Sequence, residues 1–331
     1  MSAPRKKVYV TRLIPEKGIQ LLRDQVEVDI HLGDLPPPRD TIVEHTRDKD
    51  GLLCLLTDTV DEELMGQCPR LRVISNYAVG FDNIDVAAAT KRGIVVTNTP
   101  GVLTETVADF AWALLMAAAR KTVEADRFTR AGKWKTWAPK LLLGTDVYGK
   151  TLGIVGAGRI GVSVGRRAAG FSMRILYHDV ERREDFEEQT GAKFVDFETL
   201  LRESDFVSLH VPLTADTEHM IGEKEFSKMK GNAILINTSR GPVVDEVALY
   251  RALKEGRIAG AGLDVFEREP AQASNPLFEL ENIVVAPHIA SASLETREKM
   301  AVISAQNLLD ALEERVPKFV VNPEVLGSHE R

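Results

Sequence analysis

Residues 152–161 read Leu-Gly-Ile-Val-Gly-Ala-Gly-Arg-Ile-Gly, which is a G-x-G-x-x-G pattern. An apolar, strand-like run precedes the glycines and a helical pattern follows them. In such a turn the first glycine permits a tight bend, the second lets the backbone approach a pyrophosphate, and the third allows close packing of helix on strand. The helix N-terminus adds partial positive charge. The stretch therefore predicts a dinucleotide-binding site on Gly156, Gly158, Arg159, Ile160 and Gly161.

Asp179 ends the next strand-like run and follows the last glycine by 18 residues (179 − 161 = 18). A carboxylate at this place can accept hydrogen bonds from both ribose hydroxyls of an adenosine. Strand, helix and acid together favour a cofactor site over a glycine-rich turn that serves packing alone. Asp179 would repel a 2′-phosphate, which favours NAD over NADP. Arg182 and Arg183 follow closely and can reach a phosphate, so NADP remains an alternative.

The length of 331 residues favours two domains, each able to bury its own core. The formal net charge is −7 and the basic residues stand in short pairs such as Arg166-Arg167. This distribution is typical of solvated faces and indicates no nucleic-acid partner. Cys54 and Cys68 form neither a disulfide framework nor a metal-ligand spacing, so we expect no metal and a cytoplasmic location.

No membrane or export segment is evident in the sequence. The N-terminal charges pass directly into a strand-like run, without the apolar core of a signal peptide. The most apolar helical stretch, residues 110–119, is shorter than the ~20 residues that span a bilayer. We therefore expect no membrane partner.

Short β-branched runs alternate with helical patterns along the whole chain, which predicts parallel sheets covered by helices on both faces. Apart from the run before the glycines, the strand candidates are residues 7–11, 26–30, 52–56, 71–75, 93–97, 173–177, 206–210, 233–237, 259–264 and 282–286.

The glycine motif lies in the middle of the chain, and this position determines the predicted domain order. Complete strand–helix units precede it, and one long helix at about residues 294–314 follows the last strand of the second half. We expect that helix and the tail to return to the first domain. The predicted α/β fold has two doubly wound domains, a substrate domain (1–99 and 290–331) and a Rossmann-type cofactor domain (100–289), with a cleft between them.

Three charged residues stand at the ends of strand candidates in the second half, where a doubly wound sheet binds its ligands. Arg240 follows Ile-Leu-Ile-Asn-Thr-Ser, Glu269 precedes Pro270, and His288 follows Val-Val-Ala-Pro. Each has a structural alternative: a turn arginine, a loop charge and a capped core histidine. Beside a dinucleotide site they supply a cation for a carboxylate, a proton donor and an acid that keeps the donor charged.

Over almost its whole length the sequence resembles the D-isomer-specific 2-hydroxyacid dehydrogenase family, and most of all its glyoxylate/hydroxypyruvate reductase branch. Besides the glycine motif, the resemblance is carried by residues 76–85, 98–109, 132–137, 237–245, 262–266 and 287–291.

The resemblance implies an enzyme that reduces a small 2-keto acid to the D-2-hydroxy acid, reversibly, with His288 as the acid. Glu269 would bond the other ring nitrogen, and Arg240 would bind the substrate carboxylate. The amides of Val79 and Gly80 would assist from the other domain. The resemblance places further cofactor contacts at Asp264, Thr238 and Ser239 near the nicotinamide, and at Pro212 and Thr217 on the adenosine side.

The same resemblance implies a homodimer formed through a helix and arm at about residues 102–143, a segment in the cofactor domain. Trp134 and Trp137 suit such an interface, and simple packing of the arm is the alternative. Two positions depart from the family's pattern: Ala290 stands where glycine is frequent and Asp109 where glutamate is frequent.

Several relatives of the same fold provide the competing interpretations. The Glu269–His288 pair argues against formate oxidation, which has no hydroxyl proton to transfer. A dehydrogenase for another D-2-hydroxy acid, such as 3-phosphoglycerate, is one alternative. A non-enzymatic, NAD-sensing corepressor is the other, because such proteins retain the arginine, glutamate and histidine.

Overall fold

The computed structural model describes residues 4–330 and divides into two compact units. The first unit takes in the chain up to Leu103 and from Ala292 onward, and the second spans Thr104–Ser291. The boundaries predicted from the sequence lie at 99/100 and 289/290. The long helix α12 (Leu294–Leu312) belongs to the first unit, so the chain enters that unit twice.

In the described residues, the first unit holds a five-stranded parallel sheet in the order β2-β1-β3-β4-β5. This is the flavodoxin-like order. Strands β3 to β5 are buried along their length, because helices cover both faces, and their apolar runs made them recognisable in the sequence. The strands are β1 (Lys7–Val10), β2 (Glu27–Ile30), β3 (Gly51–Cys54), β4 (Val73–Asn76) and β5 (Val95–Thr97).

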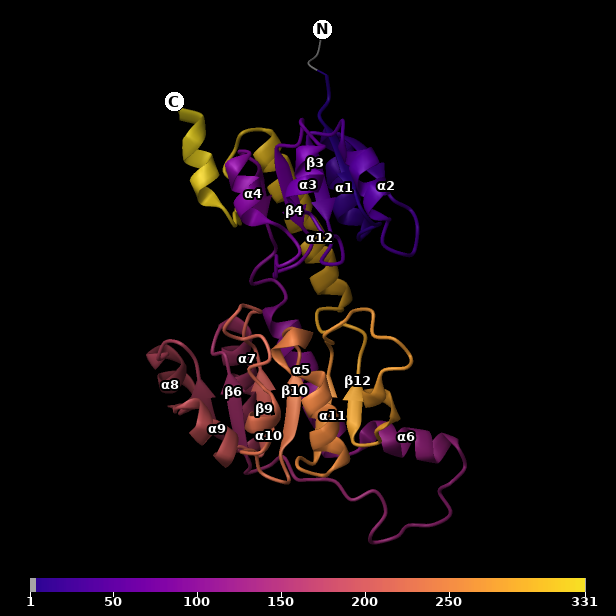
Figure 1. The fold of residues 1–331 in the computed structure, drawn as a ribbon. Coiled ribbons are helices and arrows are strands. Elements are labelled where there is room, and N and C mark those ends of the chain that lie inside the picture. Colours follow the sequence, from indigo (N-terminus) through magenta and orange to yellow (C-terminus); the bar gives the residue numbers. More distant parts are fainter. Residues whose placement is uncertain (1–3, 331) are drawn as a thin grey trace. The chain divides into compact units, whose positions relative to one another are not determined.

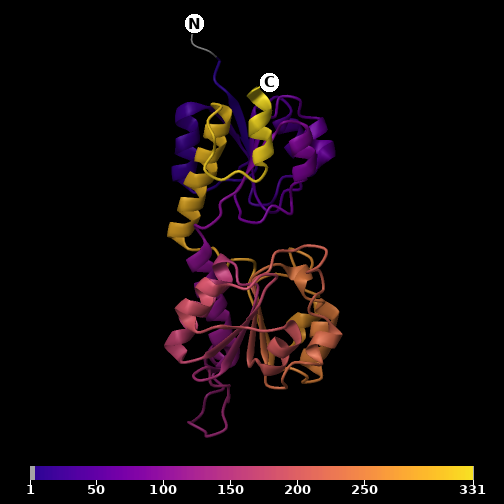
Figure 2. The same cartoon turned by 90° about the vertical axis from the view of Figure 1, so that its left-hand side faces the viewer.

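Helices lie on both sides of this sheet (Figure 2). On one face α12 packs against α1 (Glu16–Gln25), and the Ser75 hydroxyl in β4 donates to the Ser304 carbonyl of α12 at 2.8 Å. On the other face lie α2 (Arg39–Thr46), α3 (Glu62–Gly66) and α4 (Val86–Lys91), which share a buried core with Leu52 and Ile74. The 3-10 helix η4 (Pro323–Glu330) ends the described chain.

The second unit holds, in the part of the chain described, a seven-stranded parallel sheet in the order β12-β11-β10-β9-β6-β7-β8 (Figure 1). This extends the Rossmann order, so the predicted fold class is confirmed for both units. The strands are β6 (Thr151–Val155), β7 (Arg174–His178), β8 (Lys193–Phe194), β9 (Phe206–Leu209), β10 (Ile234–Asn237), β11 (Gly260–Leu263) and β12 (Ile283–Val285).

Strand β8 was not among the predicted strands. Its two residues lie exposed at the edge of the sheet, so they carry no buried apolar run. The other strand predictions agree with the structure to within a few residues at each end.

Two groups of helices cover this second sheet. On one face α5 (Thr104–Ala119), α7 (Arg159–Ala168) and α8 (Glu184–Thr190) share a core, and the Trp112 indole of α5 donates to the Val164 carbonyl of α7 at 3.0 Å. The other face is covered by α9 (Phe197–Glu203), α10 (Glu223–Phe226) and α11 (Glu246–Lys254). The short 3-10 helices are η1 (Ala169–Phe171), η2 (Gly241–Val243) and η3 (Pro276–Glu279).

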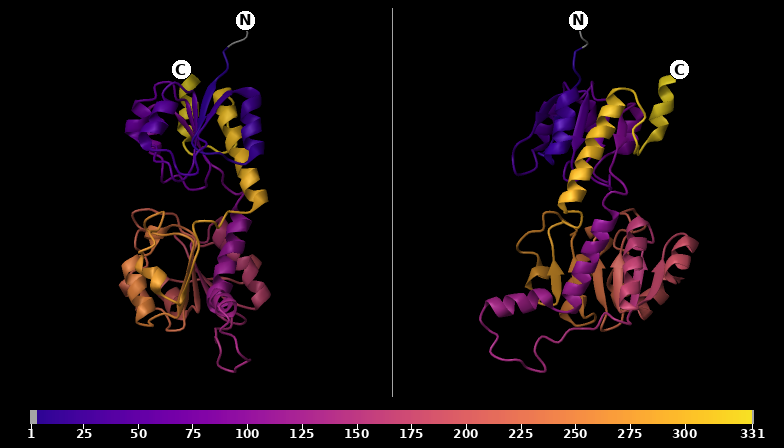
Figure 3. Two further views of the ribbon diagram at one scale, coloured as in Figure 1. Left: turned by 90° about the vertical axis from the view of Figure 1, so that its right-hand side faces the viewer. Right: turned by 180° about the vertical axis from the view of Figure 1, so that it is seen from behind.

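Helix α6 (Thr122–Arg130) and the segment between it and β6 extend away from the rest of the second unit (Figure 3). The large side chains there are open to solvent: Trp134 is 61% exposed and Trp137 79%. Among the described helices, none combines the length and apolar character needed to cross a membrane.

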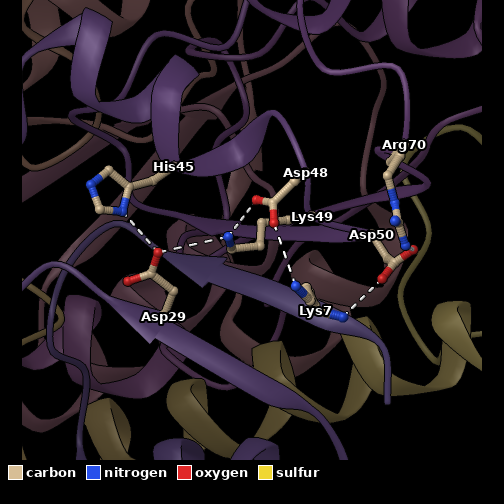
Figure 4. A network of polar contacts seen from close by, with 7 residues as sticks. All are labelled: Lys7, Asp29, His45, Asp48, Lys49, Asp50 and Arg70. Atoms are coloured by element: carbon tan, nitrogen blue, oxygen red, sulfur yellow. Dashed lines mark hydrogen bonds and ion pairs between the residues drawn. The ribbon is translucent and has the colours of Figure 1, made fainter. Parts of the chain in front are cut away.

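A buried aspartate fixes the amino end of the central strand pair in the first unit. Asp50 precedes β3 and is 4% exposed. Its carboxylate accepts from the Lys7 amide of β1 at 2.8 Å and from the Arg70 guanidinium at 3.1 Å. Figure 4 shows these contacts beside the exposed charge of Asp48 and the half-buried Lys49. Burial raises the pKa of Asp50, but these donors outweigh it and hold the pKa below the ordinary value.

The second unit repeats the arrangement. Asp205 precedes β9, is 8% exposed, and accepts from the Thr151 amide at the start of β6 at 2.9 Å. Lys230 at 2.9 Å takes the role that Arg70 has in the first unit. Burial again raises the pKa, and these donors bring it below the ordinary value. In both sheets a carboxylate therefore joins the two strands between which the strand order reverses.

We predict that Asp50→Asn loses about 1–3 kcal/mol of unfolding free energy at about pH 7, because a buried acceptor of several donors becomes an amide. The lowered pKa means that the ionised form stabilises the fold above the unfolded pKa, and that this stability is lost as pH falls through the folded pKa. When unfolding free energies are measured in urea, the difference between Asp50→Asn and wild type should therefore become smaller as the pH is lowered toward about pH 3. Asp48→Asn, whose side chain is 55% exposed, is the control and should change little. An equally stable Asp50→Asn protein would contradict the assignment.

Candidate active site

The glycine motif forms the turn from β6 into α7, and its three glycines are needed for different reasons. Gly156 has φ of +91°, and a Cβ there would lie 2.8 Å from the main chain of His210. A Cβ on Gly161 would lie 2.1 Å from the Gly156 carbonyl oxygen. Gly158 begins the helix with an ordinary φ of −70°, and a Cβ there would meet nothing within 4 Å. Neither conformation nor packing explains Gly158, whereas close approach of a ligand would.

Asp179 lies directly after β7, beside this turn. Its carboxylate accepts from the Ala157 amide at 2.6 Å and from the Val180 amide at 2.7 Å. Arg159 and Ile160 open α7, where the first amides of a helix have no acceptor within the helix. The turn thus combines anion-binding amides with a carboxylate held in place, as a dinucleotide requires.

The two arginines after Asp179 are already engaged by carboxylates. Arg182 makes two hydrogen bonds to Glu187, at 2.9 and 2.7 Å. Arg183 makes two to Asp185, at 3.0 and 2.9 Å, and a third to the Ala157 carbonyl at 3.0 Å. A phosphate near Asp179 would have to compete with these carboxylates for the two arginines.

Asn237 organises the loop that carries Arg240 at the end of β10. Its amide donates to the Arg240 carbonyl at 2.9 Å, and its oxygen accepts from the Ser239 amide and hydroxyl at 3.0 and 2.8 Å. Thr238 lies between them, and its buried hydroxyl has no hydrogen-bond partner among the described residues. Such an unpaired polar atom fits a site that a ligand completes.

Asp264 directly follows β11 and is fully buried. Its carboxylate oxygens accept from the amides of Ile289 and Ala290, each at 2.8 Å, and its carbonyl accepts from the His288 amide at 2.8 Å. Burial raises the pKa of Asp264 above its ordinary value. The contact at position 290 uses the main chain, so it does not depend on whether alanine or glycine stands there.

The imidazole of His288 is hydrogen-bonded to Glu269. The distance from Nδ1 to Oε2 is 2.7 Å, and the two side chains are 27% and 31% exposed. His288 has φ of +55°, in the left-handed region that non-glycine residues adopt infrequently. With Nδ1 bound by a carboxylate, Nε2 is the nitrogen left to exchange a proton with a ligand.

Several groups set the ionisation of Glu269. Burial raises its pKa, but the hydrogen bond and charge of His288, the Phe266 amide and the charge of Arg240 outweigh it and lower the pKa overall. Glu269 is therefore an anion at neutral pH. The charge of Arg240 thus acts on Glu269, which is itself hydrogen-bonded to His288.

Pro212 and Thr217 lie in the loop after β9. The Thr217 hydroxyl donates to the Pro212 carbonyl at 2.6 Å and accepts from the Thr214 amide at 2.8 Å, so the loop is closed on itself. This loop follows the carboxyl end of β9, beside that of β6, where the glycine turn begins.

In the first unit, two asparagines orient the loop of Val79 and Gly80. Asn98 donates to the Val79 carbonyl at 2.7 Å, and the Thr99 amide donates to the Ala78 carbonyl at 2.9 Å. In a trans peptide the carbonyl and the following amide point in opposite directions. These two bonds therefore direct the amides of Val79 and Gly80 away from residues 98 and 99. Asn76 completes the loop by donating to the Gly80 carbonyl at 2.8 Å.

Asn76, Asn98 and Asn237 were not among the predicted site residues. Each is buried and ends or follows a strand, so an asparagine directly after an apolar run was the signal available in the sequence. What the sequence could not show is which carbonyls their amides bind.

Residues 112–290 match the model for the D-isomer specific 2-hydroxyacid dehydrogenase, NAD binding domain. The chain belongs to this family. The glyoxylate reductase of Korarchaeum cryptofilum is 59% identical over 97% of both chains. The family predicted from the motifs is thus confirmed, and with it the prediction of an oxidoreductase that uses a nicotinamide cofactor.

Solved structures of other proteins share this fold. A protein from Thermus thermophilus has a TM-score of 0.91 and 45% identity, over 95% of this chain and 99% of that one. The NADPH-dependent glyoxylate/hydroxypyruvate reductase of Sinorhizobium meliloti, solved with NADP and malonate, has a TM-score of 0.84 and 33% identity, over 96% and 97%.

Substitutions at two glycines of the motif should separate cofactor binding from stability. Gly158→Ala adds a methyl group that meets no protein atom, so the unfolding free energy should change by less than about 1 kcal/mol, while NADH binding weakens at least ~10-fold, or about 1.4 kcal/mol. Gly161→Ala forces a Cβ onto the Gly156 carbonyl and should cost about 1–3 kcal/mol of stability or more. Fluorescence titration with NADH and urea unfolding measure the two effects. Wild-type affinity in Gly158→Ala would show that no cofactor approaches this glycine.

Proposed function

We propose that this protein reduces glyoxylate or hydroxypyruvate to the corresponding D-2-hydroxy acid, reversibly, with NADH. The observation that carries the proposal is the 2.7 Å bond between His288 and Glu269 at the carboxyl end of the cofactor-binding sheet. Reduction of a 2-keto acid needs a proton at the carbonyl oxygen, and this pair provides an imidazole that is hydrogen-bonded to a carboxylate.

His288 would donate its Nε2 proton to the substrate oxygen and take it back in the oxidation. Glu269 would hold the imidazole through Nδ1 and keep it charged until the proton is transferred. Arg240 would bind the substrate carboxylate, which its planar fork matches, and would polarise the neighbouring carbonyl. From the family resemblance we add the amides of Val79 and Gly80 as further donors to that carboxylate.

The bound reduced nicotinamide would supply the hydride in this reaction. This chain's residues would hold it: Gly156, Gly158, Arg159, Ile160 and Gly161 at the pyrophosphate, Asp179 at the ribose, and Pro212 and Thr217 on the adenosine side. Thr238, Ser239 and Asp264 would orient the carboxamide. The unpaired Thr238 hydroxyl supports this placement.

We propose NAD as the preferred cofactor. Asp179, which we propose binds the ribose, is held by two amides, and Arg182 and Arg183 are each bound to a carboxylate of their own. A 2′-phosphate would therefore meet an anion first. NADP remains the alternative, because exposed ion pairs of this kind are weak and can exchange partners.

We further propose a cytoplasmic homodimer that forms through residues 102–143. The exposure of Trp134 and Trp137 on the segment after α6, together with Leu143 at 64%, supports this, since monomers seldom leave such side chains open. Sedimentation velocity is the test, and a monomer would contradict it.

Initial rates with a panel of substrates test the proposed function. Glyoxylate or hydroxypyruvate should give the highest kcat/KM among glyoxylate, hydroxypyruvate, pyruvate and phenylpyruvate, and NADH should exceed NADPH. A bulky keto acid preferred by more than ~10-fold, or about 1.4 kcal/mol in transition-state binding, would overturn the substrate assignment. A preference for NADPH would show that the arginines after Asp179 dominate.

Replacing Glu269 with glutamine should change the pH dependence of both directions. The substitution keeps the shape of the side chain but removes the negative charge that stabilises a protonated imidazole. Reduction requires that proton, so the alkaline limb of its pH–rate profile should move to lower pH. Oxidation requires the neutral imidazole and should become possible at lower pH. His288→Ala, the comparison variant, should lose about 10²- to 10⁴-fold in turnover in both directions. If neither limb of the two pH–rate profiles moves in Glu269→Gln, Glu269 does not act through His288.

A further inference from the structure

A cluster of four polar side chains lies beside the loop that carries Glu269. The cluster consists of His219, Glu246, Glu267 and Asn275. Glu267 Oε1 accepts from the Glu246 amide at 2.9 Å, and the Glu267 amide donates to Glu246 Oε1 at 2.6 Å. His219 Nε2 is 3.0 Å from Glu267 Oε1, and Asn275 donates to Glu246 Oε2 at 3.0 Å. The carboxylates of Glu267 and Glu246 thus each accept a hydrogen bond from the main-chain amide of the other residue.

Glu267 supplies an acceptor that helix α11 lacks by itself. Glu246 is the first residue of α11, and the first amides of a helix have no acceptor within it. The helix cap Asp245 binds the Ala248 amide at 2.9 Å. Glu267 takes the Glu246 amide from outside the helix, and thereby attaches its own loop to the start of α11.

The cluster also joins the loop of Pro212 and Thr217 to the chain after Arg240. The His219 amide donates to the Pro242 carbonyl at 2.7 Å, and His219 adopts a φ of +50° to do so. Its ring, at the same time, reaches Glu267. One histidine therefore contacts two segments through its main chain and its side chain.

The chain after Arg240 lies directly on the loop of Glu267. A Cβ added to Gly241 would fall 1.8 Å from the main-chain carbon of Phe266, so two main chains are in contact there. The Phe266 amide in turn donates to Glu269 Oε1 at 3.1 Å. Any movement of residues 266 and 267 would therefore be transmitted to Glu269.

We propose that Glu267 is a positioning residue: together with Glu246 and His219 it fixes the loop on which Glu269 meets His288. This inference rests on the proposed function for its kinetic consequence. The Glu267 side chain is 33% exposed, and that of His219 48%, so their contacts contribute little to overall stability. Small displacements of a catalytic pair, in contrast, reduce turnover strongly.

The test compares Glu267→Ala with Glu267→Gln and with Arg268→Ala, an exposed neighbour on the same loop. Glu267→Ala should lower kcat for reduction about 10-fold with a smaller change in KM, because the loop of Glu269 loses an anchor while the Arg240 main chain stays held by Asn237. The alkaline limb of the pH–rate profile for reduction should move to lower pH in Glu267→Ala, as in Glu269→Gln. Glu267→Gln retains the acceptor oxygen and should restore most of kcat, and Arg268→Ala should match wild type.

A second readout does not depend on the substrate. In the ligand-free protein, NMR titration of the His288 ring should shift to lower pH in Glu267→Ala and remain at the wild-type position in Arg268→Ala. If Glu267→Ala does not fold, His219→Ala replaces it and should show the same direction of shift, since it removes one anchor of the same carboxylate. A wild-type enzyme inactive on the whole keto-acid panel would refute the proposed function alone. An unmoved His288 titration, with unchanged kcat, would overturn the positioning role.

Discussion

The buried Asp264 is the residue on which the geometry of the proposed catalytic pair, Glu269 and His288, depends. It joins the end of β11 to the turn after β12 by accepting from the amides of Ile289 and Ala290. The His288 amide donates to the carbonyl of the same residue, and this holds His288 in a left-handed conformation that would otherwise be unfavourable. The cost of burying the Asp264 carboxylate is offset because each of its oxygens accepts a hydrogen bond from a main-chain amide. The carboxylate of Asp264 thus holds the main chain directly after His288, and its carbonyl holds His288 itself.

Much of the architecture could be predicted from the sequence, because parallel strands covered on both faces are short apolar runs. Strand β8 escaped prediction since Lys193 and Phe194 lie exposed at an edge. Among the candidate site residues, Arg240, Glu269 and His288 could be proposed because each follows a predicted strand and carries a reactive group. Asn98 and Glu267 could not, because their roles depend on which main-chain atoms lie nearby, and residue type and spacing do not contain that information.

Both sheets place a carboxylate at the amino end of the strand pair where the order reverses. Asp50 binds the Lys7 amide, and Asp205 binds the Thr151 amide. In each case a basic side chain, Arg70 or Lys230, lies on the other oxygen. Ligands of doubly wound folds bind at the opposite ends of these same strands. Fixing the register at the amino ends thus determines where the loops at the carboxyl ends begin, without placing a structural charge next to the ligand.

Asparagines hold the loops at the carboxyl ends of the strands, whereas aspartates join the strands at their amino ends. The chemistry of the proposed ligands gives a reason for this difference. Asn98 and Asn237 organise their loops by donating to carbonyls, which adds no charge. A carboxylate in their place could not donate and would repel the pyrophosphate and the keto-acid carboxylate that we propose bind there. The acids that do stand at these ends in the second unit, Asp179, Asp264 and Glu269, are each held by main-chain amides. Asp179 and Glu269 therefore place negative charge where, in the proposed reaction, a ribose hydroxyl and an imidazolium would meet it.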